Sequence, residues 1–570
     1  MPLSNAFRPR IAAKLNLLYP GQSAEVLQRI DALADRYRPR LAARDGALWD
    51  ERSVILITYG DQVSSADRPA LAVQDEFLRE FGFDDLLTGV HLLPFYPYSS
   101  DDGFSVIDYR AVKENMGDWP DVERLSRTFE LMFDFVLNHC SQQNEWFRKF
   151  LAGEEPYTQY FHAVDPSLDL SSVTRPRSTP LLTPFETDRG TQHVWTTFSA
   201  DQVDLNFGCP DLLIEMLEIL LDYVERGAGL IRLDAIGFLW KKLGTTCMHL
   251  PETHAVVKIM RDLLDDLAPG TIVITETNVP HAENISYFGT GDEAHAVYQF
   301  SLAPLLLDAF ATGDAGPLLN WLGNLEYPGP GMTFFNFTAS HDGIGVRPLE
   351  GLVDPDRLDG LVEHVRKLGG RVSMRRKPDG SESPYELNIT YFSALNTPEG
   401  LPPEVHARRF LTSQGIMLAL RGMPGIYFHS LVGTPNWKEG VAETGHNRTI
   451  NRRKFDLDEL RDIVQAGGTA QKLVFDGYRK MLGIRIAQPA FHPDAPLEMV
   501  ETGHPSVIGF ERTSIDGSQR ILVLANVGTA PVELDLTALT DVAVATDLLS
   551  GQNVDSGNRV VEPSALLWLT

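Results

Sequence analysis

The stretch from Gly229 to Gly237, GLIRLDAIG, is apolar except for one cation and one anion in its middle. Arg232 and Asp234 lie two positions apart, so in a β-strand both side chains point to the same side. A guanidinium beside a carboxylate favours the ionised form, and an ionised carboxylate can act as a nucleophile. The pair therefore predicts a reactive Asp234; the alternative is a structural ion pair without a chemical role.

Other apolar runs also end in polar or charged residues. These are Asp101 after LTGVHLLPF, Asn138 and His139 in LMFDFVLNH, Glu276 after TIVIT, and His341 and Asp342 in TFFNFTASHD. Buried charges without a task are costly and seldom accumulate, so we expect these residues to meet in one site.

Two carboxyl groups on neighbouring strands suit one reaction in particular. Asp234 and Glu276, if they lie about 5–5.5 Å apart, could carry out a retaining double displacement at a glycosidic bond. One carboxylate attacks the anomeric carbon, while the other protonates the leaving oxygen and later deprotonates the incoming acceptor. Asp342 then offers a third carboxylate that stabilises positive charge on the sugar ring.

The elements that must position these residues recur along the chain as short apolar runs followed by helical patterns. Runs rich in β-branched and aromatic residues are typical of strands buried on both faces of a parallel sheet. Eight strands that alternate with helices predict an α/β fold, a TIM (β/α)8 barrel, whose strand ends meet at one face. The eight runs cover residues 54–60, 87–95, 131–139, 230–237, 271–278, 296–302, 333–342 and 424–430.

The remaining segments predict additions to the barrel. Two connections are too long for simple turns, and we expect loop-inserted subdomains after strands 3 and 7, over the active-site face. Short alternating runs near the end predict a C-terminal antiparallel β-domain. The predicted division is 1–52 for an N-terminal helical extension, 53–139 with 206–342 and 397–482 for the catalytic barrel, 140–205 and 343–396 for the two insertions, and 483–570 for the C-terminal domain.

Composition narrows the environment and the partners. The net charge of −27 argues against nucleic acid and anionic membranes as partners. No run approaches the roughly 20 apolar residues of a membrane span, and the first residues contain no apolar block typical of a signal peptide. The chain has 3 cysteines, widely spaced, which favours free thiols in a reducing compartment. We therefore expect a cytoplasmic enzyme with a small-molecule substrate.

The ordered motifs resemble those of a known family. FVLNH with His139, QVDLNF with Asp204, IRLDAIG, ITETN and ASHDG are similar to the signature segments of the α-amylase superfamily, glycoside hydrolase family 13. LITYGDQ, GVHLLPFYPYSSDDGF, TRPR, SHDGIGV and NRTINR further resemble the sucrose phosphorylase subfamily. The resemblance extends from the first strand into the C-terminal domain.

The resemblance implies a role for each matching residue. Asp234 would be the nucleophile, Glu276 the general acid/base and Asp342 the transition-state stabiliser. In this subfamily phosphate resolves the covalent glucosyl-enzyme, giving α-D-glucose 1-phosphate with retention. The residues implied to bind the glucosyl unit in the −1 subsite are Asp101, His139, Arg232, His341 and Arg448, and those implied to bind phosphate and the leaving group alternately in the +1 subsite are Arg177 and Tyr385.

The same resemblance implies no metal and no cofactor, with inorganic phosphate as a co-substrate, and a monomer or homodimer. Asn138 matches a calcium-ligand position of amylases, but sucrose phosphorylases are not calcium enzymes. A hydrolase or transglucosylase with the same carboxylates remains an alternative, as does a catalytically silent sugar-binding barrel.

The leaving group stays open between fructose, from sucrose, and glycerate, from glucosylglycerate. Glu386 follows Tyr385 where sucrose phosphorylases carry glutamine, which argues against fructose. The stretches SVTRPRSTPLLTPF and TETNVPHAENISYFG are similar to the glucosylglycerate phosphorylase branch. A basic cluster in the second insertion could favour an anionic acceptor, could draw in phosphate, or could be a solvated loop tip; it comprises Arg371, Arg375, Arg376 and Lys377.

Overall fold

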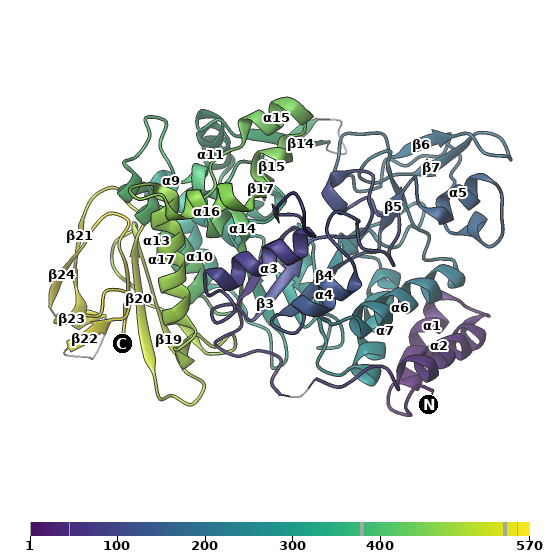
Figure 1. Cartoon of the computed structure of the whole chain (residues 1–570), viewed down its shortest axis with the longest axis horizontal. Coiled ribbons are helices and arrows are strands. Elements are labelled where there is room, and N and C mark those ends of the chain that lie inside the picture. Colours follow the sequence, from purple (N-terminus) through teal and green to yellow (C-terminus); the bar gives the residue numbers. More distant parts are fainter. Residues whose placement is uncertain (1, 45, 377–380, 540–543, 556) are drawn as a thin grey trace.

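Eight parallel strands close into a barrel at the centre of the molecule (Figure 1). The computed structural model describes residues 2–44, 46–376, 381–539, 544–555 and 557–570. Each of the eight apolar runs overlaps one barrel strand, so the predicted (β/α)8 fold is confirmed. The strands are β1 (Ile55–Thr58), β3 (Gly89–Leu92), β4 (Glu130–Val136), β9 (Ala228–Asp234), β10 (Ile272–Thr275), β11 (Ala296–Tyr298), β12 (Thr333–Asn336) and β16 (Met423–Tyr427).

Helices cover the outside of the barrel and bury one apolar face each against it. The helices α6 (Pro210–Glu225) and α7 (Pro251–Leu267) both begin with proline, whose fixed φ and missing N–H suit the first helical position. The other helices of this layer are α3 (Ala70–Glu80), α4 (Trp119–Leu125), α9 (Leu302–Thr312), α10 (Gly316–Gly323), α13 (Pro403–Ala419), α16 (Leu457–Gln465) and α17 (Ala470–Arg485). No helix in the described ranges combines the length and apolarity that a membrane crossing requires.

The connection after β4 is long and forms small sheets of its own. The strand β5 (His139–Ser141) pairs with β8 (Gln202–Asp204), and β6 (Leu182–Phe185) pairs with β7 (Gln192–Trp195). The short helix α5 (Glu145–Leu151) packs beside them (Figure 1). We call residues 140–205 the first insertion.

The connection after β12 forms a three-stranded antiparallel sheet and one helix. The strand β15 (Glu382–Asn388) lies between β13 (Ile344–Gly345) and β14 (Arg371–Arg376), and α11 (Pro355–Lys367) covers the sheet. We call residues 343–396 the second insertion. Within its basic cluster, Lys377 and the side chain of Arg376 lie outside the described residues.

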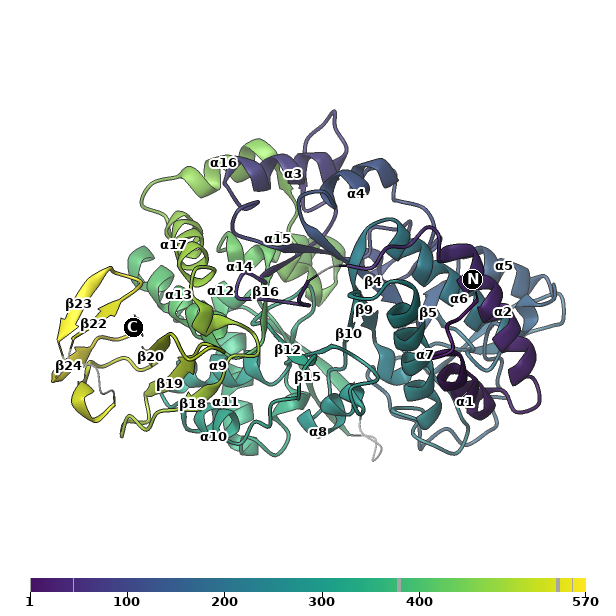
Figure 2. The ribbon, with the colours of Figure 1, turned by 90° about the horizontal axis from the view of Figure 1, so that it is seen from below.

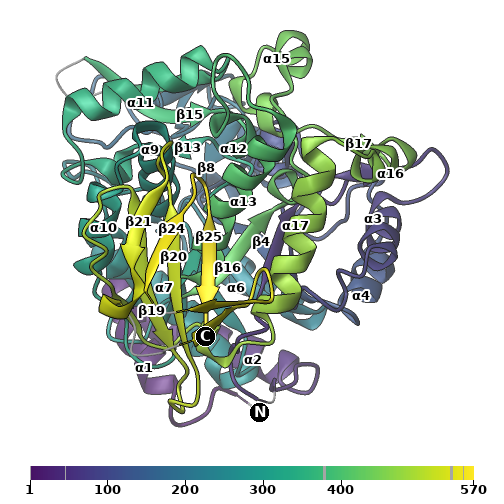
Figure 3. The same cartoon turned by 90° about the vertical axis from the view of Figure 1, so that its left-hand side faces the viewer.

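The two ends of the chain add one layer each. The N-terminal helices α1 (Arg8–Leu18) and α2 (Ser23–Tyr37) pack beside α7 and α6 (Figure 2). At the other end, antiparallel strands form a sheet beside α13 and α17, and the predicted C-terminal β-structure is confirmed (Figure 3). Its strands are β18 (Leu497–Met499), β19 (Val507–Thr513), β20 (Arg520–Asn526), β25 (Leu566–Leu569), β22 (Val544–Asp547) and β23 (Gln552–Asp555), with the separate pair β21 (Val532–Asp535) and β24 (Asn558–Val561).

Candidate active site

A pocket of about 820 Å³, including its open mouth, lies beyond the carboxyl ends of the barrel strands. Its walls come from the strand ends and from both insertions. It brings together all of the predicted site residues except Arg232, which lies buried beneath it. Those that line the pocket are Asp101, His139, Arg177, Asp234, Glu276, His341, Asp342, Tyr385 and Arg448.

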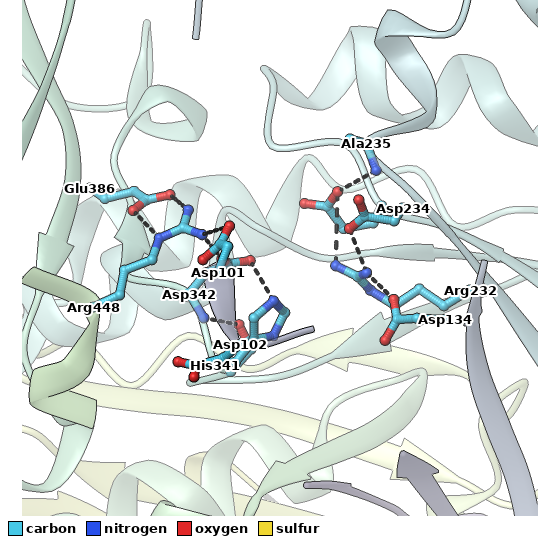
Figure 4. Close-up of polar contacts among 12 residues, drawn as sticks. Asp101, Asp102, Asp134, Arg232, Asp234, Ala235, His341, Asp342, Glu386 and Arg448 are labelled. Atoms are coloured by element: carbon cyan, nitrogen blue, oxygen red, sulfur yellow. Dashed lines mark hydrogen bonds and ion pairs between the residues drawn. The ribbon is translucent and has the colours of Figure 1, made fainter. Parts of the chain in front are cut away.

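The floor of the pocket is organised around Arg232. Its Nη1 lies 2.7 Å from Asp234 Oδ1, and its Nη2 lies 3.9 Å from Glu276 Oε2. The same guanidinium contacts Asp134 on β4 from the other side (Figure 4). Strand register explains the meeting, because Arg232 pairs with Asp134 on one neighbouring strand and with Ile274 on the other.

A backbone hydrogen bond connects Glu276 to the residue that follows Asp234. The N–H of Ala235, the residue after Asp234, donates to Glu276 Oε2 at 3.0 Å. Ala235 has a φ of 47°, a left-handed conformation that costs a non-glycine residue about 1–3 kcal/mol. The left-handed turn at Ala235 directs this N–H toward Glu276. Asp234 and Glu276, which were predicted to share a site, therefore lie together around the guanidinium of Arg232.

Burial controls the protonation of this pair. It raises the pKa of Asp234 well above its usual range, although Arg232 opposes the shift. Burial also raises the pKa of Glu276, again against Arg232 and with a contribution from the charge of Asp342. We expected Arg232 to keep Asp234 ionised; the guanidinium acts in that direction, but removal from water outweighs it.

A second arginine organises the opposite wall. Arg448 Nη1 lies 2.7 Å from Asp342 Oδ1 and 3.8 Å from Asp101 Oδ2. Its Nε donates to Glu386 Oε2 at 3.1 Å, so Glu386 holds the far side of the guanidinium (Figure 4). Burial acts to raise the pKa of Asp342, but the guanidinium of Arg448, with those of Arg452 and Arg232, outweighs it and lowers that pKa below its usual range. Asp342 is therefore a stable anion facing the pocket.

Two histidines complete the inner pocket as neutral groups. The ring of His341 stacks on Phe104 with 4.5 Å between centroids, and burial lowers its pKa to about 3. The Nε2 atom of His139 lies 2.8 Å from the carbonyl oxygen of Phe104, and burial lowers its pKa as well. Neutral imidazoles can donate hydrogen bonds to sugar hydroxyls without adding charge.

The structure corrects where some of these residues lie in the fold. We predicted that His341 and Asp342 end the seventh strand, but β12 ends at Asn336 and both residues lie in the loop beyond it. His139 likewise lies beyond β4, on β5, where it pairs with Asp204. In both cases the apolar run continues past the last barrel hydrogen bond.

Arg177 and Tyr385 come from different insertions and meet over the pocket. The guanidinium of Arg177 lies 5.3 Å from the centre of the Tyr385 ring, which is within cation–π range. Its Nη1 lies 3.8 Å from Glu386 Oε1. The basic cluster contributes Arg375 to the pocket lining, whereas Arg371 is exposed and lies outside the lining.

Several functional residues were missed from the sequence. Asp134 sits on β4 between Arg232 and His91, whose Nε2 lies 2.6 Å from Asp134 Oδ2. Arg452 holds Asp101 and Asp102 through Nη1, at 3.1 and 2.9 Å. Asp134 stands out within the apolar run LMFDFVLNH and could have been found, whereas nothing in NRTINRRK distinguishes Arg452 from Arg448.

Beside the position where amylases bind calcium, the structure places a lysine. Lys241 Nζ lies 2.6 Å from Asp204 Oδ2 and donates to Asn138 Oδ1 at 2.6 Å. An ammonium there satisfies the same oxygen atoms that would otherwise face a cation. Among the residues that the structure describes, no group of three or more His, Cys, Asp or Glu side chains is arranged to hold a metal.

Comparison with known proteins places the chain in a family. Residues 74–320 match the model of the alpha-amylase catalytic domain. The glucosylglycerate phosphorylase of Spirochaeta thermophila is 47% identical over 508 residues, which cover 87% of this chain and 86% of that protein. The chain belongs to the α-amylase family, glycoside hydrolase family 13.

Other members of this family differ in how closely they resemble the chain. The glucosylglycerate phosphorylase of Escherichia coli is 43% identical over 85% of this chain and 86% of that protein. The sucrose phosphorylase of Bifidobacterium adolescentis is 29% identical over 69% of this chain and 81% of that protein. Among solved structures, sucrose 6F-phosphate phosphorylase from Thermoanaerobacter thermosaccharolyticum superimposes with a TM-score of 0.72, at 24% identity over 84% of this chain and 94% of that one. At this identity the superposition supports the fold alone.

Proposed function

We propose that this protein is a retaining glucosylglycerate phosphorylase. It transfers the glucosyl unit of 2-O-α-glucosylglycerate to inorganic phosphate and releases α-D-glucose 1-phosphate and glycerate, reversibly. The observation that carries the choice of donor is the similarity itself: relatives named for glucosylglycerate are 43–47% identical, whereas the sucrose phosphorylase of Bifidobacterium adolescentis is 29% identical. In the choice that the sequence left open, the similarity therefore favours glycerate.

The first half-reaction uses the two carboxyl groups around Arg232. Glu276 gives its proton to the glycosidic oxygen while Asp234 attacks the anomeric carbon, so a C1–Oδ bond forms as the C1–O bond to glycerate breaks. Burial raises the pKa of both carboxyl groups, but the reaction needs the negative charge on Asp234 and the proton on Glu276. The closer contact of Arg232 with Asp234, at 2.7 Å against 3.9 Å for Glu276, favours this distribution. The anionic Asp342 stabilises positive charge that develops on the sugar ring.

The second half-reaction restores the enzyme. A phosphate oxygen attacks C1, its proton passes to Glu276, and the bond to Asp234 breaks. Two inversions at C1 give net retention. Arg177 is assigned to phosphate, because its guanidinium lines the pocket beside Tyr385 and offers a fork of donors that matches phosphate oxygens.

The inner pocket is assigned to the glucosyl unit. Asp101, His139, His341 and Arg448 line it, and Arg232 supports it from beneath. We propose no cofactor, with inorganic phosphate as a co-substrate, because Glu276 supplies the proton transfers and Asp234 supplies the nucleophile that the reaction needs. The three cysteines are free and buried, which supports a cytoplasmic location. A monomer and a homodimer both remain compatible with the proposal.

The test is synthesis in reverse. α-D-Glucose 1-phosphate is offered with fructose, fructose 6-phosphate, glycerol or D-glycerate, and initial rates are ranked. D-Glycerate should be the preferred acceptor, and preference for fructose would contradict the proposal. A second measurement follows free glucose released from glucosylglycerate with and without phosphate. Release at the same rate without phosphate would show a hydrolase.

A further inference from the structure

Charges are distributed unequally between the bottom of the pocket and its mouth. Acidic side chains gather at the bottom, around Arg232 and Arg448. Around the mouth lie Arg175, Arg177, Arg347 and Arg375, and the one acidic residue among the lining there is Glu386, which Arg448 already holds. A cationic mouth on a chain of net charge −27 indicates that the outer part of the pocket is built for an anion.

Arg347 lines the pocket with a guanidinium whose hydrogen-bond donors the described residues satisfy only in part. Its side chain is 15% exposed, and its Nε is buried without a hydrogen-bond partner among those residues. Within the described residues it forms an ion pair with Glu283, at 3.5 Å, and the side chain of Glu283 is 41% exposed. An exposed carboxylate at that distance is screened by water and contributes little. The guanidinium therefore retains donors for a ligand.

Asn278 links Arg347 to the general acid/base. It follows Glu276 by two positions and lines the pocket. Its amide packs on Gly345, where an added Cβ would come within 2.5 Å of the amide atoms, and Gly345 precedes Arg347 by two positions. The Oδ1 atom of Asn278 is buried and, within the described chain, has no hydrogen-bond partner. Unpaired buried polar atoms are costly, so two of them lining one pocket point to a ligand that pairs with them.

Arg375 differs from Arg347 although both line the pocket. Its Nε donates to Ser383 Oγ at 3.2 Å, and its Nη2 donates to Glu350. Arg177 is also engaged, with Tyr385 and Glu386. Of these three arginines, Arg347 is the one with a buried guanidinium nitrogen that has no hydrogen-bond partner within the described residues.

We propose that Arg347 and Asn278 form the subsite that recognises the acceptor. The Arg347 guanidinium binds the carboxylate of glycerate, and Asn278 Oδ1 accepts a hydrogen bond from a glycerate hydroxyl. Phosphate remains with Arg177. This assignment rests on the proposed function, because it needs an anionic acceptor, and it makes Arg347 the residue that separates glycerate from neutral alcohols.

The test separates acceptor recognition from phosphate recognition in the full-length enzyme. Arg347→Gln is assayed for synthesis from α-D-glucose 1-phosphate with D-glycerate and with glycerol, which has the same carbon skeleton without the carboxylate. Loss of a hydrogen-bonded charge should lower kcat/KM for D-glycerate by about 10- to 100-fold, while the rate with glycerol changes little. Asn278→Ala should weaken both acceptors, because the hydroxyl contact serves both.

A second readout does not involve the acceptor at all. Exchange of labelled inorganic phosphate into α-D-glucose 1-phosphate needs the glucosyl subsite and the phosphate site alone. Arg347→Gln should retain this exchange, which also shows that the variant is folded. The charge control is Arg366→Gln on α11, whose side chain is exposed and lies outside the pocket lining. It should match the wild type in every assay.

The outcomes are distinct. If wild-type enzyme does not use D-glycerate, the proposed function fails. If wild-type enzyme uses D-glycerate but Arg347→Gln leaves its KM unchanged, the assignment of Arg347 is wrong. If phosphate exchange is lost together with glycerate use in a folded Arg347→Gln protein, Arg347 belongs to the phosphate site. Arg347→Lys, which keeps the charge and loses the fork, should fall between wild type and Arg347→Gln.

Discussion

The arginine at the bottom of the pocket and the arginine at its mouth differ in how deeply they and their carboxylate partners are buried. Arg232 is almost fully buried, its side chain 2% exposed, and it contacts carboxylates that neighbouring barrel strands fix in register. Arg347 comes from an insertion, and the side chain of its partner Glu283 is 41% exposed. Charges removed from water interact strongly and in one geometry, whereas exposed pairs are weak and easily exchanged for a ligand. In the proposed function, the barrel therefore holds the carboxyl groups that react, and the insertions hold the arginines that bind phosphate and glycerate.

The sharpest test of the bottom of the pocket removes the nucleophile. Asp234→Asn keeps the shape of the side chain and its contact with Arg232 but cannot form the glucosyl-enzyme. Turnover should fall by at least about 10⁴-fold in both directions. The melting temperature and circular dichroism should stay close to those of the wild type. A near-normal rate in this variant would remove the basis for the proposed mechanism.

The next effect in size concerns the general acid/base. Glu276→Gln should lower turnover of glucosylglycerate by about 10²–10⁴-fold, because no proton reaches the leaving oxygen. With α-D-glucosyl fluoride as donor, whose leaving group needs no proton, formation of the glucosyl-enzyme should recover. Equal losses with both donors would show that Glu276 has a structural role instead.

The same residue predicts a pH dependence. Glu276 must be protonated to act as the acid, and burial raises its pKa above the usual range. Activity on glucosylglycerate should therefore fall as pH rises through that raised pKa. The alkaline fall should be absent when Glu276→Gln acts on α-D-glucosyl fluoride. An alkaline limb that persists in the variant would have to be assigned to another group.

At the mouth of the pocket the expected effect is smaller and selective. Arg177→Ala should raise the KM for phosphate by about 10- to 100-fold, since it removes a charged hydrogen-bond donor from a partly solvated site. Saturation by glucosylglycerate and formation of the glucosyl-enzyme should change little. Phosphate saturation that does not change would exclude Arg177 from the phosphate site.

The same contrast explains what the sequence could predict. The eight strands were visible because strands buried on both faces are continuous apolar runs. Asp234 and Glu276 could be placed together because they lie at the ends of two strands that the order of these runs predicts to be neighbours in the barrel. The contacts of Arg232 with Asp134, and of Asp134 with His91, depend on register between strands, which no local pattern records.

The insertions were visible as long connections, but their contacts were not. Glu386 was noticed as a departure from the family, yet its hold on Arg448 depends on how β15 lies over the pocket. Arg347 lies outside the quoted motifs, and Asn278 ends the motif ITETN without a role implied for it. What distinguishes both residues is a buried atom without a hydrogen-bond partner in the described chain. The residues proposed to choose the acceptor were therefore the least predictable part of the site.

The smallest expected effect comes from a change in salt concentration, which tests the difference between the mouth and the bottom of the pocket without a mutation. Raising ionic strength from about 0.02 to 0.5 M shortens the Debye length several-fold, so the partly exposed cations at the mouth lose attraction for phosphate and glycerate. The KM values for both anions should rise a few-fold, while kcat stays constant because the charges around Arg232 are shielded from salt by burial. A neutral acceptor such as glycerol should show no change in KM. If kcat fell while the anion KM values stayed constant, the buried charges at the bottom would be the salt-sensitive ones, and the division of labour between barrel and insertions would be wrong.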